Sequence, residues 1–121
     1  MPSVTSQACG RLVVAEHARF WAAEQDIFRT FIGLGRVDPE VGEVVDRHDS
    51  GRRDNLRQAV VRLSGEGALG RGWTVTTATD VLWFLTGFEA FDYLHRRGGL
   101  SVRATASLLE SLARAILRDR A

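Results

Sequence analysis

Residues 74–117 constrain the fold of this chain more than any other stretch. Two helical patterns meet there at Gly98 and Gly99, and each carries apolar residues on more than one face. The pattern at 101–118 has two adjacent apolar stripes, one of Val102, Ala106, Leu109, Ala113 and Ile116 and one of Thr105, Leu108, Leu112 and Ala115. A surface helix needs only one stripe to pack on its own core. The second apolar stripe therefore predicts that another surface covers this helix, most simply that of a second copy of the chain.

Helical periodicity also covers the rest of the chain. Apolar residues recur at helical spacing in four segments, at 7–32, 39–64, 74–97 and 101–118. Asp38 and Pro39 are residue types preferred at an N-cap and at the first helical position. Neither of the two prolines falls inside a periodic segment, and 121 residues fit one domain. We therefore predict a single all-α domain over 1–121, a helical bundle of about four to five helices.

The charge balance and the single cysteine argue against several classes of protein. The 16 basic residues, all of them arginine, oppose 15 acidic residues and give a formal net charge of +1. This balance offers no overall basic field, so we expect no direct contact with nucleic acid by this chain alone. Cys9 is the one cysteine, which favours a reducing, cytoplasmic compartment. No run of 18 apolar residues is present, so we expect no membrane span.

Motifs for catalysis and for metal binding are not found. The glycine-rich stretch at 65–72 lacks the Gly-Lys-Ser/Thr ending of a phosphate-binding loop. His17, His48 and His95 fall on different predicted helices, so they lack the clustering that a zinc site needs. No serine lies in a Gly-x-Ser-x-Gly turn. We expect no enzyme, no metal and no cofactor; a small helical enzyme would need a convergent acid-base pair, which the spacing does not show.

His48 and Arg52 interrupt the apolar stripe of the 39–64 helix one turn apart. They are polar anchors in an apolar ligand pocket, or else a hydrogen-bonded core histidine and an arginine that extends to solvent. The aromatic residues that would wall such a pocket are Phe20, Trp21, Phe28, Phe31, Trp83 and Phe84. Aromatic residues at helical spacing are also what an ordinary core contains, so both interpretations stay open.

Several short motifs, in this order and spacing, resemble the C-terminal half of TetR-family transcriptional regulators. They are RFWA at 19–22, DPEV at 38–41, DVLWFLTGFE at 80–89, FDYL at 91–94, RGGLS at 97–101 and the apolar helix at 108–117. The likeness covers most of the chain, from about residue 9 to residue 118. It implies an all-α domain that binds an effector and forms a homodimer.

In that family, the last two helices of each subunit pair into a four-helix bundle. The residues that the resemblance places at this seam are Phe88, Phe91, Ala104, Leu108, Leu112 and Ala115. It also implies a small apolar or aromatic effector bound among the first three helices. The three-helix DNA-binding head that precedes this region in the family is not in the sequence, so we expect no operator binding by this polypeptide alone. The alternative is a headless interaction module that dimerises with regulators and binds no ligand.

Overall fold

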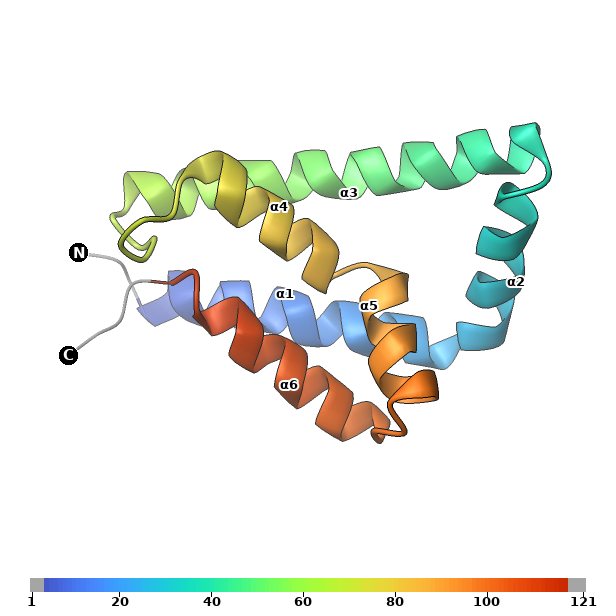
Figure 1. Ribbon diagram of the computed structural model, residues 1–121. Helices are drawn as coiled ribbons and strands as arrows, with labels where there is room; N and C mark the ends of the chain where they lie inside the picture. The colour runs from blue at the N-terminus through green and yellow to red at the C-terminus, as the bar shows by residue number, and fades with distance from the viewer. Residues whose placement is uncertain (1–3, 118–121) are drawn as a thin grey trace.

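The protein is all-helical in the region that its structure, a computed structural model, describes (Figure 1). The description covers the backbone of residues 4–117 and the side chains from residue 14 onward. The helices are α1 (Val4–Ala23), α2 (Gln25–Gly35), α3 (Pro39–Gly65), α4 (Val75–Leu85), α5 (Phe88–Asp92), the π-helical turn η1 (Tyr93–Arg97) and α6 (Val102–Arg114). Within these residues the only β pairing is one bridge between Leu69 and Leu117. The predicted all-α class is confirmed.

Two of the four predicted helices are each broken into two, which makes six α-helices in the described residues. The predicted helix at 7–32 ends at Ala23, because Glu24 leaves the helical conformation with φ −134° and ψ 38°. The predicted helix at 74–97 breaks at Thr86 and Gly87, and Gly87 has an extended backbone. No proline marks either break. The first break turns the chain so that α2 connects the end of α1 to the start of α3 (Figure 1).

The contact between α2 and α3 depends on two glycines and a strong N-cap. Asp38 accepts hydrogen bonds from the backbone N–H groups of Glu40 and Val41, as its residue type predicts. A Cβ atom on Gly42 would lie 2.7 Å from the carbonyl oxygen of Gly35. The two backbones therefore pack at a distance that only glycine permits. From Pro39, α3 continues as one helix of 27 residues through Gly51.

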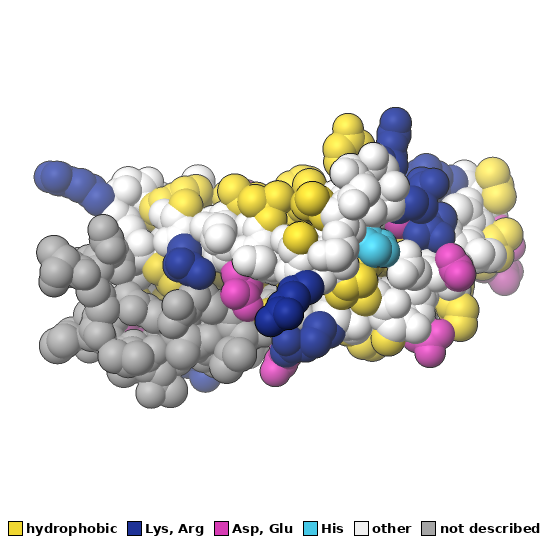
Figure 2. Space-filling model, turned by 90° about the horizontal axis from the view of Figure 1, so that it is seen from below, with side chains coloured by type: hydrophobic (Ala, Val, Ile, Leu, Met, Phe, Trp, Pro, Cys, Tyr) yellow, Lys and Arg dark blue, Asp and Glu magenta, His cyan; other side chains and the backbone are white. Residues whose placement is uncertain are grey.

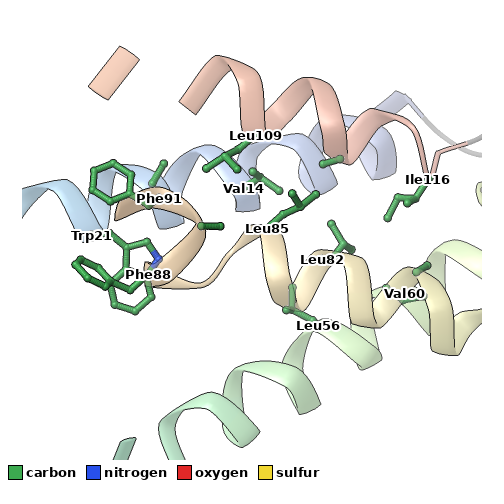
Figure 3. Close-up of a cluster of buried hydrophobic side chains, with 14 residues drawn as sticks. Val14, Trp21, Leu56, Val60, Leu82, Leu85, Phe88, Phe91, Leu109 and Ile116 are labelled. Atoms are coloured by element: carbon green, nitrogen blue, oxygen red, sulfur yellow. The ribbon is translucent and has the colours of Figure 1, made fainter. Parts of the chain in front are cut away.

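The core lies between α1, α4, α5 and α6, and α3 covers it from one side (Figure 3). α1 packs along α6, and α3 packs along α4. The core side chains labelled in Figure 3 are Val14, Trp21, Leu56, Val60, Leu82, Leu85, Phe88, Phe91, Leu109 and Ile116. Leu109 and Ala113 on α6, and Ile116 just after it, face this core and belong to the first of the two predicted stripes. The second stripe lies beside it and remains largely uncovered in one chain.

Candidate functional site

A groove of about 610 Å³ runs between α1 and α3. In Figure 1, α3 runs along the top and α1 crosses the middle of the molecule, with α2 joining them at one end. α1 contributes His17 and Trp21. α3 contributes the basic residues Arg47, His48, Arg52 and Arg62 together with Gly51, Asn55, Leu56 and Ala59. The volume falls in the range of small-molecule sites, about 300–1,000 Å³.

The break between α4 and α5 lies close to this groove and is held by side chains from α1 and α3. Thr86 is fully buried, and its hydroxyl donates a hydrogen bond to the carbonyl oxygen of Leu82 at 2.8 Å. Its own carbonyl oxygen accepts a hydrogen bond from Trp21 Nε1 at 2.8 Å. A helix end leaves carbonyl groups without partners inside the helix. Trp21 supplies one of the missing donors here.

Arg52 supplies the other donors at the end of α4. Its guanidinium donates to the carbonyl oxygen of Trp83 at 2.5 Å and to Thr86 Oγ1 at 2.7 Å. A cation at a helix C-terminus also interacts favourably with the helix dipole. Burial lowers the pKa of Arg52, although a 3.3 Å ion pair with Asp49 acts in the opposite direction. Arg52 is thus a half-buried cation that belongs both to the groove and to the α4–α5 junction.

The ligand-binding residues predicted from the sequence are only partly brought together. Trp21, His48 and Arg52 all line the groove. His48 is solvent-exposed, so the alternative of a core histidine is wrong. The other aromatic candidates, Phe20, Phe28, Phe31, Trp83 and Phe84, do not line the groove.

Those other aromatic side chains have separate environments. Phe28 packs edge-on against Trp21, with ring centroids 4.7 Å apart, and so extends the core. Trp83 donates a hydrogen bond through Nε1 to the carbonyl oxygen of Asp49. Phe20, Phe31 and Phe84 are exposed, and Phe84 is the most exposed of them at 67%. These five residues therefore do not wall the groove, although Trp83 and Phe84 line a smaller concavity of about 290 Å³ together with Arg52.

Two of the six predicted seam residues are wrong. Phe88 and Phe91 are buried in the core of a single chain, at 5% and 0% exposure, so their side chains offer no surface to a second subunit. The kink at Gly87 rotates α5 relative to α4 and turns both rings inward. The remaining four, Ala104, Leu108, Leu112 and Ala115, are exposed on the outer side of α6. Seen from the side of α6, apolar side chains gather in a band along the molecule (Figure 2).

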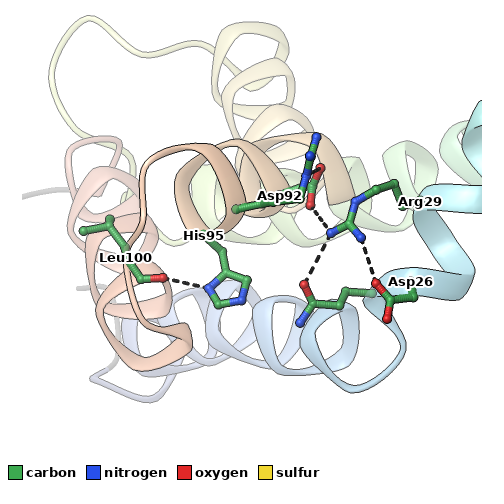
Figure 4. A network of polar contacts seen from close by, with 7 residues as sticks. Asp26, Arg29, Asp92, His95 and Leu100 are labelled. Atoms are coloured by element: carbon green, nitrogen blue, oxygen red, sulfur yellow. Dashed lines mark hydrogen bonds and ion pairs between the residues drawn. The ribbon is translucent and has the colours of Figure 1, made fainter.

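A polar cluster joins α2 to the α5–η1 segment at a second concavity of about 440 Å³ (Figure 4). Arg29 donates to Asp92 at 2.6 Å and to Asp26 at 2.8 Å. Burial alone would raise the pKa of Asp92, but the hydrogen bond and charge of Arg29, with those of Arg96, hold that pKa below its ordinary value. In the next turn, the ring of His95 stacks on Phe91, and its Nδ1 lies 2.7 Å from the carbonyl oxygen of Leu100. These arginines are neutralised by acidic partners, which is typical of a structural cluster.

Sequence reasoning missed the basic character of the groove. It identified His48 and Arg52 but not His17, Arg47 or Arg62. The signal was present, because residues 47, 51, 55, 59 and 62 follow helical spacing on one side of α3. That side lies next to the apolar stripe, and its polar residues are also typical of an ordinary solvent-exposed helix face.

Comparison with family models, with curated proteins and with solved structures finds no match to this chain. None of the helices in the described residues is long and apolar enough to cross a membrane. The same part of the chain holds no group of three or more His, Cys, Asp or Glu side chains arranged to bind a metal. The resemblance to TetR-type regulators remains a prediction from the sequence.

Proposed function

We propose that this chain is the effector-binding and dimer-forming domain of a TetR-type transcriptional regulator. The observation that carries the proposal is the groove of about 610 Å³ between α1 and α3. The sequence resemblance implies a ligand site among the first three predicted helices, and both walls of the groove come from that part of the chain. The proposed location is the cytoplasm, where a regulator of this kind acts.

The outer face of α6 supports the dimer-forming part of the proposal. Leu108 and Leu112 are 39% and 47% exposed and lie one turn apart. Ala104 and Ala115 lie on the same side of the helix, where small side chains let two helices approach closely. Exposed apolar side chains that gather on one face are typical of an interaction surface. The proposed partner is a second copy of the chain.

The proposed mechanism is a ligand-driven shift between two dimer geometries. A ligand shifts such an equilibrium only by binding one state more tightly than the other. Trp21 and Arg52 line the groove and also hold the α4–α5 junction through Thr86 and the carbonyl oxygen of Trp83. A ligand that moves either side chain would therefore change the direction in which α5 leaves α4. The effect would reach α6 through η1.

Light scattering on the purified protein tests the dimer. We expect twice the chain mass for the native sequence at micromolar concentration, and the single-chain mass for Leu112→Arg, because a seam would bury an unpaired charge. Ser107→Arg is the matched control, since it adds the same side chain to the polar side of the same helix. A native protein that is monomeric, or a Leu112→Arg variant that still dimerises, would contradict the proposed seam.

The competing function is a helical module that dimerises with regulators and binds no small molecule. The uncovered α6 face supports it as much as it supports the leading proposal. A dimer that binds neither of the two fluorescent probes described below would favour this module.

A further inference from the structure

The formally charged side chains that line the groove are all cationic. They are three arginines, the groove also holds two histidines, and among the described residues no Asp or Glu lines it. The whole chain has a net charge of only +1. The concentration of positive charge therefore belongs to this groove and does not follow from a basic protein.

Part of this charge has no acidic partner. The ion pairs among the described residues use Arg29, Arg52, Arg53 and Arg96. Arg47 and Arg62 form none of them. Arg52 has Asp49 as a partner at 3.3 Å, and the charge of Glu89 also acts on it.

The spacing along α3 places the cations at two ends of the groove. Arg47 and Arg62 are 15 residues apart, or about 22 Å along a helix. Arg47, His48 and Arg52 line the part of the groove nearer α2, and a Cβ on Gly51 in the same part would meet nothing within 4 Å. Trp21 and Leu56 are largely buried, at 8% and 5% exposure, and their exposed edges form the apolar floor of the groove. A compact ligand can therefore place an acidic group near Arg47 and an apolar body against Trp21.

We propose that the groove binds an amphipathic organic acid, with its anionic group held by Arg47 and Arg52 and its apolar body lying over Gly51 against Trp21 and Leu56. Guanidinium groups bind planar carboxylates through paired hydrogen bonds, so a carboxylate is bound more tightly than its neutral analogue. This inference rests on the proposed function, because it names the chemical class of the effector for the same groove.

Two fluorescent probes that differ by one charged group provide the test. Anilinonaphthalene sulfonate is anionic, and phenylnaphthylamine has the same aromatic body without the acid. We expect the native protein to bind the anionic probe at least roughly fivefold more tightly, and Arg47→Gln to weaken that probe roughly fivefold to tenfold, as for loss of one charge-assisted hydrogen bond. Arg57→Gln is the matched control, because Arg57 is exposed on α3 but does not line the groove.

Competition with unlabelled compounds identifies the ligand class. Decanoate should displace the anionic probe at lower concentration than decanol, which has the same chain without the acid. Gly51→Trp should abolish binding of both probes, because its side chain would fill the open space of the groove. Displacement by a short oligothymidylate at lower concentration than decanoate would assign the groove to nucleic acid and overturn the inference.

The outcomes separate the two proposals. Equal affinity for the charged and the neutral probe, with both lost in Gly51→Trp, would refute the acidic ligand and leave a ligand-binding groove. If neither probe binds the folded native protein, the proposed effector-binding function fails together with the inference.

Discussion

Replacement of Arg52 by methionine should destabilise the protein far more than the same replacement at its neighbour Arg53. Arg52 donates to Trp83 O and to Thr86 Oγ1 at 2.5 and 2.7 Å, at a helix end with no other strong donor for that carbonyl group. A hydrogen bond from a charged group contributes about 1.5–3 kcal/mol. Methionine keeps most of the apolar stem of arginine. It also removes the cost of burying a charge, and this gain offsets part of the stability lost with the hydrogen bonds. We expect a net decrease of about 2–3 kcal/mol in the free energy of unfolding.

Urea unfolding followed by circular dichroism measures this difference. Arg53 lies next in the chain and pairs with Asp80 at 2.7 Å, but the two side chains are 31% and 53% exposed. The Arg53 guanidinium also lies 5.4 Å from the centre of the Trp83 ring. Exposed ion pairs and exposed cation–π contacts each contribute at most about 1 kcal/mol, so Arg53→Met should lower stability by less than Arg52→Met does. All variants are compared at one protein concentration, because the stability of a dimer depends on it. Equal losses for Arg52→Met and Arg53→Met would refute the role given to Arg52 at the α4–α5 junction.

Two further predictions concern stability. Gly42→Ala and Gly51→Ala make the same change in the same helix, yet a Cβ would meet a backbone oxygen at 2.7 Å at position 42 and open space at position 51. We expect a lower melting temperature for Gly42→Ala and a gain of about 0.5–1 kcal/mol in the free energy of unfolding for Gly51→Ala. A higher melting temperature for Gly42→Ala would contradict the close contact. The lowered pKa of Asp92 means that its ionised form stabilises the fold above the ordinary carboxyl pKa of about 4, and that this stability is lost as the pH falls through the lower folded value. Native protein should therefore lose more stability than Asp92→Asn between pH 5 and pH 3 in acid titrations, and parallel curves would rule out this contribution.

The all-α class was predictable because helical spacing persists through nearly every segment. Asp38 was predicted as an N-cap, and its side chain accepts backbone hydrogen bonds at the start of α3, as the side chains of Thr74 and Ser101 do at the starts of α4 and α6. The breaks were harder to predict. Glu24 is a good helix former, so its departure from helical geometry does not follow from local preference.

The candidate site was less predictable than the fold, because it depends on the angle between helices. His48 and Arg52 were recognised as polar residues within an apolar stripe. Their neighbours Arg47 and Arg62 belong to the groove only because α1 and α3 diverge, and α2 holds them apart. Periodicity defines the faces of each helix but not the distance between two helices. For the same reason, periodicity does not predict that Phe88 and Phe91 turn into the core after Gly87.

The helix α2 connects α1 to α3 and sets the distance between them at one end of the molecule. None of its residues is fully buried, and its closest approach to α3 is a contact between glycine backbones. Segments with few buried apolar contacts open at lower free energy than the core. The separation of α1 and α3 at this end therefore depends on a helix with no fully buried residue, whereas α1 and α6 share the buried core.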